Sequence, residues 1–178
     1  MVGNLMGDFR KYLRAAVLPE LVSRGIANHV RVDRFTDSNL QVLNLKRLFS
    51  PARRRFAGII IDVSFDHFLI RHWQRFSDED LEEFIDQTHH NIASLREIMP
   101  GHMQHAMDYM IREDWLRSYA NLDGISFALN RMSSRIRFEN KLAGAIEEVE
   151  QHYEELEQGF LQFFPELLEH VETHKELV

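Results

Sequence analysis

Apolar residues recur at intervals of three and four along most of this chain, the spacing of a helix with one buried face. No segment alternates apolar and polar residues in the way that predicts a half-buried strand. Helices are predicted over residues 5–16, 20–35, 40–50, 52–75, 77–99, 103–112, 115–122, 125–132 and 138–164. The pattern therefore predicts an all-α fold, a helical bundle.

Local signals set the ends of several predicted helices. Thr36, Asp37 and Ser38 resemble a helix end followed by an N-cap, and the acids after Ser77 suit the positive end of a helix dipole. Asp123-Gly124 is predicted to form a turn or cap. Pro165 is predicted to break or kink the last helix.

Length and composition narrow the class of protein. A chain of 178 residues with 44% apolar and 28% charged residues predicts one globular domain over residues 1–178. The net charge of −7 argues against general nucleic-acid binding, which needs a basic surface. There is no cysteine, which excludes disulfides and thiolate metal sites. Because no apolar run is long enough to span a membrane and no leader pattern is visible, a cytoplasmic location is expected.

Acidic residues and histidines recur with helical spacing between residues 28 and 72. His29 and Asp33 are four residues apart, which places them about 40° from each other on one helix face. Asp37 follows four residues later. Asp62 and Asp66 repeat this spacing, His67 follows directly, and Asp8 lies in the first predicted helix. Imidazole and carboxylate together suit Mn²⁺, Fe²⁺, Zn²⁺ or Mg²⁺, and such an ion promotes phosphoester hydrolysis.

These residues also allow a non-catalytic interpretation. An isolated His/Asp pair is more often a surface pair or a cap than a metal site. Asp62 and Asp66 carry more weight, because they interrupt the apolar segment 58–69 and need either a metal ion or an arginine as compensation. The basic run Arg53, Arg54 and Arg55 is either a solvated turn or a docking patch for an acidic partner or phosphate.

Several motifs together closely resemble the acyl carrier protein phosphodiesterases, a family considered related to the HD-type phosphohydrolases. The motifs lie in collinear order over nearly the whole chain, which makes them far more specific together than any one alone. They are Gly3-Asn4-Leu5-Met6-Gly7-Asp8-Phe9, the stretch from His29 through Asp33 to Asp37, Asp62-Val63-Ser64-Phe65-Asp66-His67, Trp115-Leu116-Arg117-Ser118-Tyr119, Leu129-Asn130-Arg131-Met132-Ser133-Ser134-Arg135, and Phe160-Leu161-Gln162-Phe163-Phe164-Pro165.

The resemblance implies an HD-domain-like fold, a reaction and a set of residues. Members of the family cleave 4′-phosphopantetheine from a serine of acyl carrier protein, and they use a divalent cation, typically Mn²⁺ or Mg²⁺. By motif match, Asp8, Asp33 and Asp66 are expected to be catalytic. The expected metal ligands are Asp8, His29, Asp33, Asp37, Asp62, Asp66 and His67. Because acyl carrier protein is acidic, Arg53, Arg54, Arg55 and Arg135 are expected to bind it, with no nucleic-acid or membrane partner.

Two points remain open at the level of sequence. Members of the family usually begin with a further segment that carries an Asn-Phe-Leu-Ala-His type motif, and we expect this segment to be missing here. The alternatives to a carrier-protein hydrolase are an HD-like phosphohydrolase of a nucleotide or another small phosphoester, and a non-catalytic helical module that binds a carrier protein.

Overall fold

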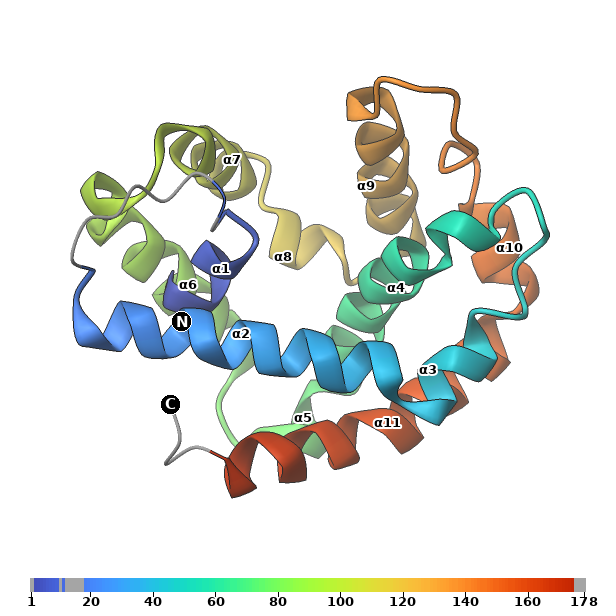
Figure 1. Cartoon of the computed structure of the whole chain (residues 1–178), viewed down its shortest axis with the longest axis horizontal. Coiled ribbons are helices and arrows are strands. Elements are labelled where there is room, and N and C mark those ends of the chain that lie inside the picture. Colours follow the sequence, from blue (N-terminus) through green and yellow to red (C-terminus); the bar gives the residue numbers. More distant parts are fainter. Residues whose placement is uncertain (1, 10, 12–17, 175–178) are drawn as a thin grey trace. The chain divides into compact units, whose positions relative to one another are not determined.

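The computed structural model describes residues 2–9, 11 and 18–174, and every regular element in these residues is helical (Figure 1). The α-helices are α1 (Val2–Gly7), α2 (Glu20–Ser38), α3 (Leu40–Leu45), α4 (Ala57–Arg71), α5 (Trp73–Phe76), α6 (Leu81–Ser94), α7 (Gly101–Arg112), α8 (Trp115–Ser118), α9 (Leu122–Arg135), α10 (Ile146–Gln151) and α11 (Tyr153–Thr173). The all-α prediction is confirmed. Within the described residues, no helix combines the length and the apolar character that crossing a membrane requires.

The backbone contacts divide the chain into two compact units. Unit 1 contains the residues up to Phe35, Glu79–Trp115 and the residues from Leu167 onward. Unit 2 contains Thr36–Asp78 and Leu116–Glu166. The single domain over residues 1–178 stays a prediction.

The two units bury different kinds of side chain. In unit 1 the buried residues of α1 and α7 are mainly methionines, Met6, Met103, Met107 and Met110. Methionine is unbranched and flexible, so it fills irregular gaps between short helices. In unit 2 the core is aromatic: the Phe65 ring lies 5.3 Å from that of Phe160 and 5.5 Å from that of Phe163, between centroids. Such aromatic pairs stabilise packing beyond the area that they bury.

Helix α4 is the central element of unit 2. Its buried side chains include Ile60, Ile61, Val63 and Phe68, which cover one broad side of the helix. Helix α9 packs along it, as Figure 1 shows, and α10 packs against α9. The acids of α4 are left on its remaining open face.

Two helix ends differ from the predicted ones, because the capping residues are close to the predicted ones in sequence but not identical with them. Helix α2 continues through Thr36–Asp37 to Ser38, and Asn39 caps α3 by accepting a hydrogen bond from the Gln41 amide at 2.9 Å. Helix α6 begins after Asp80 rather than at Ser77, because the Asp80 carboxylate accepts hydrogen bonds from the amides of Glu82 and Glu83. An N-cap side chain bonds the second or third helical amide, as Asn39 and Asp80 do here.

Two long predicted helices are wrong in their boundaries. The helix predicted over residues 52–75 begins at Ala57, because residues 51–56 form turns and a short 3₁₀ helix, Arg54–Phe56. The helix predicted over residues 138–164 begins at Ile146 and is interrupted at His152. Of the first predicted helix, residues 5–16, residues 5–7 belong to α1 and residues 8–9 to the turn after it. Residue 10 and residues 12–16 lie outside the described residues.

Pro165 and Asp123-Gly124 do not end helices. Pro165 lies inside α11, which runs on to Thr173. Its ring faces solvent, so water can bond the carbonyl that loses its amide partner. Asp123-Gly124 lies in the first turn of α9. A Cβ at Gly124 would lie 2.0 Å from the Ser118 carbonyl oxygen, so close packing rather than a turn explains this glycine.

Candidate active site

Three glycines allow α1 to lie directly on α2 in unit 1. A Cβ on Gly3 would lie 2.5 Å from the Val22 carbonyl oxygen, and a Cβ on Gly25 would lie 2.7 Å from the Gly3 Cα. Real Cβ atoms do not approach other atoms so closely, so the two backbones meet only where side chains are missing. The Gly3 and Gly7 spacing of the first motif is therefore a helix-contact face.

The same contact brings polar groups together. A Cβ on Gly7 would lie 2.1 Å from the His29 ring, so the imidazole occupies the space beside this glycine. Asn28, which directly precedes His29, donates a hydrogen bond from its Nδ2 to Asn4 Oδ1 of α1 at 3.0 Å. Asp8 follows Gly7 in the turn after α1, and it is thereby held next to the ring of His29.

His29 is the point on which two carboxylates converge. Its Nε2 lies 3.4 Å from Asp8 Oδ1 and 3.2 Å from Asp33 Oδ2. The His29 side chain is 19% exposed, while those of Asp8 and Asp33 are 71% and 57% exposed. The predicted i, i+4 pair is thus observed, and packing of α1 adds Asp8 to it. The arrangement presents one imidazole nitrogen and two carboxylates to solvent.

The chemistry of this group fits a divalent cation. Imidazole nitrogen and carboxylate oxygen are the ligands that Mn²⁺ and related ions take. Ligands bonded to one ion at about 2.0–2.2 Å are separated by roughly 3.0–3.4 Å, which is the range of the two distances from His29 Nε2. Among the described residues, however, no group of three or more such side chains is arranged as a finished metal site. The metal therefore stays a prediction.

Asp37, the next acid of this series, lies in a different setting. It is exposed at the last turn of α2, in unit 2, and its Oδ1 lies 3.0 Å from Lys46 Nζ. A negative charge is unfavourable at the C-terminal end of a helix, and the lysine offsets it. In the structure Asp37 is thus paired with a cation of the protein itself.

Asp62 and Asp66 lie on the open face of α4. Both are exposed to solvent, whereas the residues between them, from Val63 to Phe65, are buried. Surrounding protein limits the hydration of the Asp66 carboxyl, and this together with the nearby Asp62 carboxylate raises the pKa of Asp66 to about 7. Asp66 is therefore half-protonated near neutral pH, as a proton-transfer group would be.

Tyr119 is a neighbour of Asp66 that the motif contained but the predicted site residues did not. It is buried, at 7% exposure, and its pKa is raised by burial and by the negative charge of Asp66. Its phenol therefore stays protonated and can act only as a neutral donor or acceptor. The Trp115–Tyr119 motif held the only sequence signal for this residue.

His67 is fixed inside unit 2. It is 2% exposed, its Nδ1 lies 2.7 Å from the Tyr119 carbonyl oxygen, and its Nε2 lies 3.0 Å from the Tyr153 hydroxyl. Burial lowers its pKa below the usual value, which favours the neutral ring. Both nitrogens are engaged by the protein, so the geometry favours a positioning role over the predicted metal ligation.

The predicted docking arginines have different roles in unit 2. Arg53 is tied to Glu148, with Nη1 2.8 Å from Oε1, and its Nε donates to the Lys141 carbonyl. Arg54 donates to backbone carbonyls at the end of the preceding segment. Arg55 and Arg135 are exposed. Arg54 is exposed as well, so of these four arginines Arg53 is the one largely enclosed by its partners.

Comparison with known sequences places this chain in a family. The profile of the family described as acyl carrier protein phosphodiesterase matches residues 1–167. Similar proteins of that name come from Pectobacterium atrosepticum, 37% identical over 98% of this chain and 91% of the relative, and from Serratia proteamaculans, 37% identical over 95% and 88%. A third, from an Enterobacter species, is 36% identical over 93% of this chain and 86% of its own.

No solved structure matches the chain significantly, so the HD-domain-like fold stays a prediction. The family, in contrast, is shown by the sequence comparisons. Its profile covers nearly all of the chain, and the identities of the relatives extend over most of both sequences. The chain therefore belongs to the acyl carrier protein phosphodiesterases, a family of hydrolytic enzymes.

Proposed function

We propose that the chain hydrolyses the phosphodiester that joins 4′-phosphopantetheine to acyl carrier protein, and that it does so with a divalent cation. The observation that carries the proposal is the convergence of Asp8 and Asp33 on His29 Nε2 in a chain of this family. The relatives' name supplies the substrate, and the donor set supports the cation.

Asp8, His29 and Asp33 would hold the cation in unit 1. A bound Mn²⁺ or Mg²⁺ would supply a Lewis acid for a phosphoryl oxygen and would lower the pKa of a bound water. The three side chains reach this position because α1 lies on α2 through its glycines. His29 is held by packing against Gly7, which fixes the direction of its Nε2.

Within unit 2, Asp66 has the property that a proton-transfer group needs, in keeping with the catalytic role that the motif match implies for it. A group whose pKa is near the working pH can both accept and donate a proton efficiently. The pKa of about 7 gives Asp66 this property, which an ordinary exposed aspartate lacks. Tyr119 and His67 support it as positioning residues, because His67 bonds the Tyr119 carbonyl and so ties the chain at Tyr119 to α4.

The experiment is a mass measurement on the carrier protein. Purified enzyme is incubated with holo-acyl carrier protein and Mn²⁺, and a parallel sample contains EDTA. Conversion to the apo mass that depends on Mn²⁺ is the expected result. Turnover of free nucleotides without any conversion of the carrier protein would contradict the proposed substrate, and conversion that is insensitive to EDTA would contradict the cation.

Single substitutions test the residues. Asp8→Asn and Asp33→Asn each remove a negative charge from the proposed cation site without changing the shape of the side chain. Each is expected to lower kcat/KM at least 100-fold, which corresponds to a loss of about 2.7 kcal/mol of transition-state stabilisation. Asp78→Asn is the matched control, because Asp78 is an exposed carboxylate outside the group. An equal change in kcat/KM for all three variants would contradict a cation site at Asp8 and Asp33.

A further inference from the structure

One face of unit 2 combines arginines with half-exposed aromatic rings. Phe127 is 50% exposed and Phe138 is 52% exposed. Single exposed apolar residues are ordinary, but these two lie among guanidinium groups. We define the Arg–Phe surface as Arg55, Phe127, Arg131, Arg135 and Phe138.

Helical spacing explains half of this surface. Phe127, Arg131 and Arg135 follow one another at intervals of four in α9, so they share one side of the helix. The buried residues Ile125 and Leu129 lie roughly opposite, where α9 packs on α4. The Arg131 guanidinium lies 5.9 Å from the centroid of the Phe127 ring.

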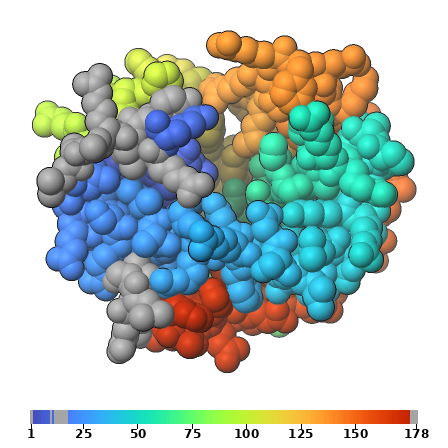
Figure 2. Space-filling view, in the orientation of Figure 1, coloured from blue at the N-terminus to red at the C-terminus, as the bar shows by residue number. Residues whose placement is uncertain are grey.

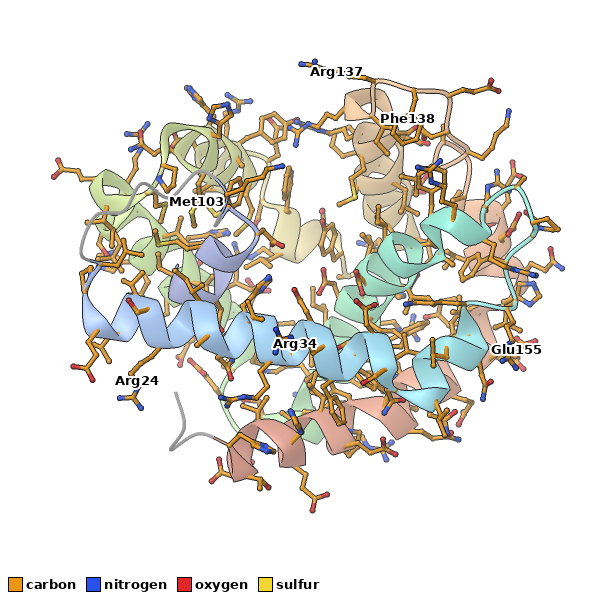
Figure 3. All side chains as sticks on the ribbon, in the orientation of Figure 1. Arg24, Arg34, Met103, Arg137, Phe138 and Glu155 are labelled. Atoms are coloured by element: carbon orange, nitrogen blue, oxygen red, sulfur yellow. The ribbon has the colours of Figure 1, made fainter. Side chains whose placement is uncertain are left out.

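The segment after α9 supplies the other half. Ser133 Oγ donates to Asn140 Oδ1 at 2.7 Å, and Asn140 Nδ2 donates to the Ser133 carbonyl, so the segment folds back on the helix end. Figure 3 shows Phe138 and Arg137 just beyond the last turn of α9. The Arg55 guanidinium lies 5.0 Å from the centroid of the Phe138 ring, which joins the 3₁₀ segment Arg54–Phe56 to the same surface.

The surface has an excess of positive charge. Arg131 and Arg135 are successive residues of one helix face, and both partial removal from water and the charge of Arg135 lower the pKa of Arg131. On the outward side of α9 the carboxylate is Asp123, in the first turn. After the helix, Glu139 is paired with Lys141 at 3.3 Å. The protein as a whole carries a net charge of −7, so this basic face contrasts with the charge of the chain as a whole.

We propose that the Arg–Phe surface docks a carboxylate-rich protein surface that also offers apolar side chains. Arginine and aromatic residues are the types that dominate the energetics of protein–protein interfaces. Arginine forms bidentate bonds with carboxylates, and the two rings gain by leaving water. If the proposed function is correct, on which this identification of the partner rests, the docked surface is that of the carrier protein.

The chemistry favours a protein over a nucleic acid. A nucleic-acid surface usually carries a continuous row of cations that neutralise many phosphates. Here a few arginines alternate with phenylalanine rings on an acidic molecule. Figure 2 shows the residues of α9 and the following loop, in orange, at the surface of the molecule.

The test measures binding to apo-acyl carrier protein, which lacks the phosphodiester and so separates docking from catalysis. The dissociation constant is measured by fluorescence anisotropy for wild type, Arg131→Ala, Arg135→Ala and Phe138→Ala. Each substitution is expected to raise Kd about tenfold, and added salt is expected to weaken wild type more than the arginine variants. Arg24→Ala and Leu168→Ala are the matched controls, since both side chains are exposed in unit 1.

Each outcome is decisive for one of the two proposals. Wild type that binds the apo-carrier through this surface but does not hydrolyse the holo-carrier would keep the docking proposal and overturn the proposed function. Hydrolysis with equal Kd values in all variants would do the reverse. Absence of binding by wild type, or tighter binding of duplex DNA or anionic vesicles than of the carrier protein, would overturn the docking surface. Circular dichroism confirms that each variant is folded.

Discussion

His29 and His67 lie in contrasting surroundings. His29 is partly exposed, and its Nε2 faces two carboxylates. His67 is buried, and both of its nitrogens lie within hydrogen-bonding distance of protein oxygens. A buried neutral histidine with two partners stabilises a fold, whereas an open one next to acids can bind a ligand. The two residues should therefore respond differently to substitution.

Substitution of these histidines separates stability from metal binding. His67→Leu leaves the Tyr119 carbonyl and the Tyr153 hydroxyl without partners, so we expect the free energy of unfolding to fall by about 2–4 kcal/mol in a urea titration. If Mn²⁺ binds the folded protein and raises its Tm, this rise should persist in His67→Leu. His29→Ala removes a largely enclosed ring from the contact between α1 and α2, so it should lower the stability of the metal-free protein by about 1 kcal/mol and also abolish that rise. The reverse pattern would restore His67 as the metal ligand.

The raised pKa of Asp66 predicts a pH dependence of stability. The folded state holds this proton up to about pH 7, whereas the unfolded chain releases it near the ordinary value of 3.8. Between these values the folded state binds more protons, so this group's contribution to stability falls as pH rises. Asp66→Asn removes the charge and should raise Tm at pH 8 by about 2–4 °C, which corresponds to about 1 kcal/mol after discounting for solvent screening.

The difference in Tm between Asp66→Asn and wild type should vanish near pH 4, where wild-type Asp66 is protonated in the folded state. Thermal unfolding of both proteins from pH 4 to 8 measures this. Asp78→Asn serves as the control, because an exposed aspartate outside this setting should give no such trend. A constant difference across this range would contradict the raised pKa.

At the scale of elements, the packing of α1 on α2 assembles the acid and imidazole groups. Helix α1 is only six residues long, too short to be stable alone, so its contact with α2 must hold it. The glycines of this contact bring the backbones together, and the Asn4–Asn28 hydrogen bond fixes the register. Asp8 reaches His29 only when this contact is intact.

Gly7→Ala tests this dependence. The new Cβ would lie 2.1 Å from the His29 ring, so either the ring or α1 must move. We expect kcat/KM to fall at least tenfold, with a smaller Mn²⁺-induced rise in Tm. Gly101→Ala is the matched control, because a Cβ there meets nothing within 4 Å and alanine suits a helix better than glycine. Full activity of Gly7→Ala would show that the contact does not position His29.

At the scale of the whole molecule, a bound cation should act as a stabilising ligand. A ligand that binds only the folded state stabilises it by RT ln(1 + [L]/Kd), which is about 2.7 kcal/mol at 100 times Kd. For a chain of 178 residues this predicts that EDTA lowers Tm by about 5–10 °C from its value in saturating Mn²⁺. Adding Mn²⁺ back should restore it, and differential scanning fluorimetry measures both steps. An equal Tm in EDTA and in Mn²⁺ would argue against a cation bound to the folded chain.

The helical class, several of the helices and the family could all be predicted from the amino-acid pattern. Helical periodicity is a local property, because each backbone hydrogen bond joins residues only four apart and one side of each helix is buried. The pattern can therefore be recognised without knowing which other helices pack against that side. For the same reason α7 was predicted to within two residues, and the His29–Asp33 pair is observed as predicted. The collinear motifs also identified the family.

Which of the acids, histidines and arginines meet depends on how the helices pack. That Asp8 joins His29, that His67 is buried between Tyr119 and Tyr153, and that Arg53 is tied to Glu148 all depend on residues far apart in the chain. Phe138 beside Arg55 gave no periodic signal. Such contacts are set by how helices pack, and because a side chain's burial and pKa follow from its neighbours in space, spacing along the sequence cannot supply them.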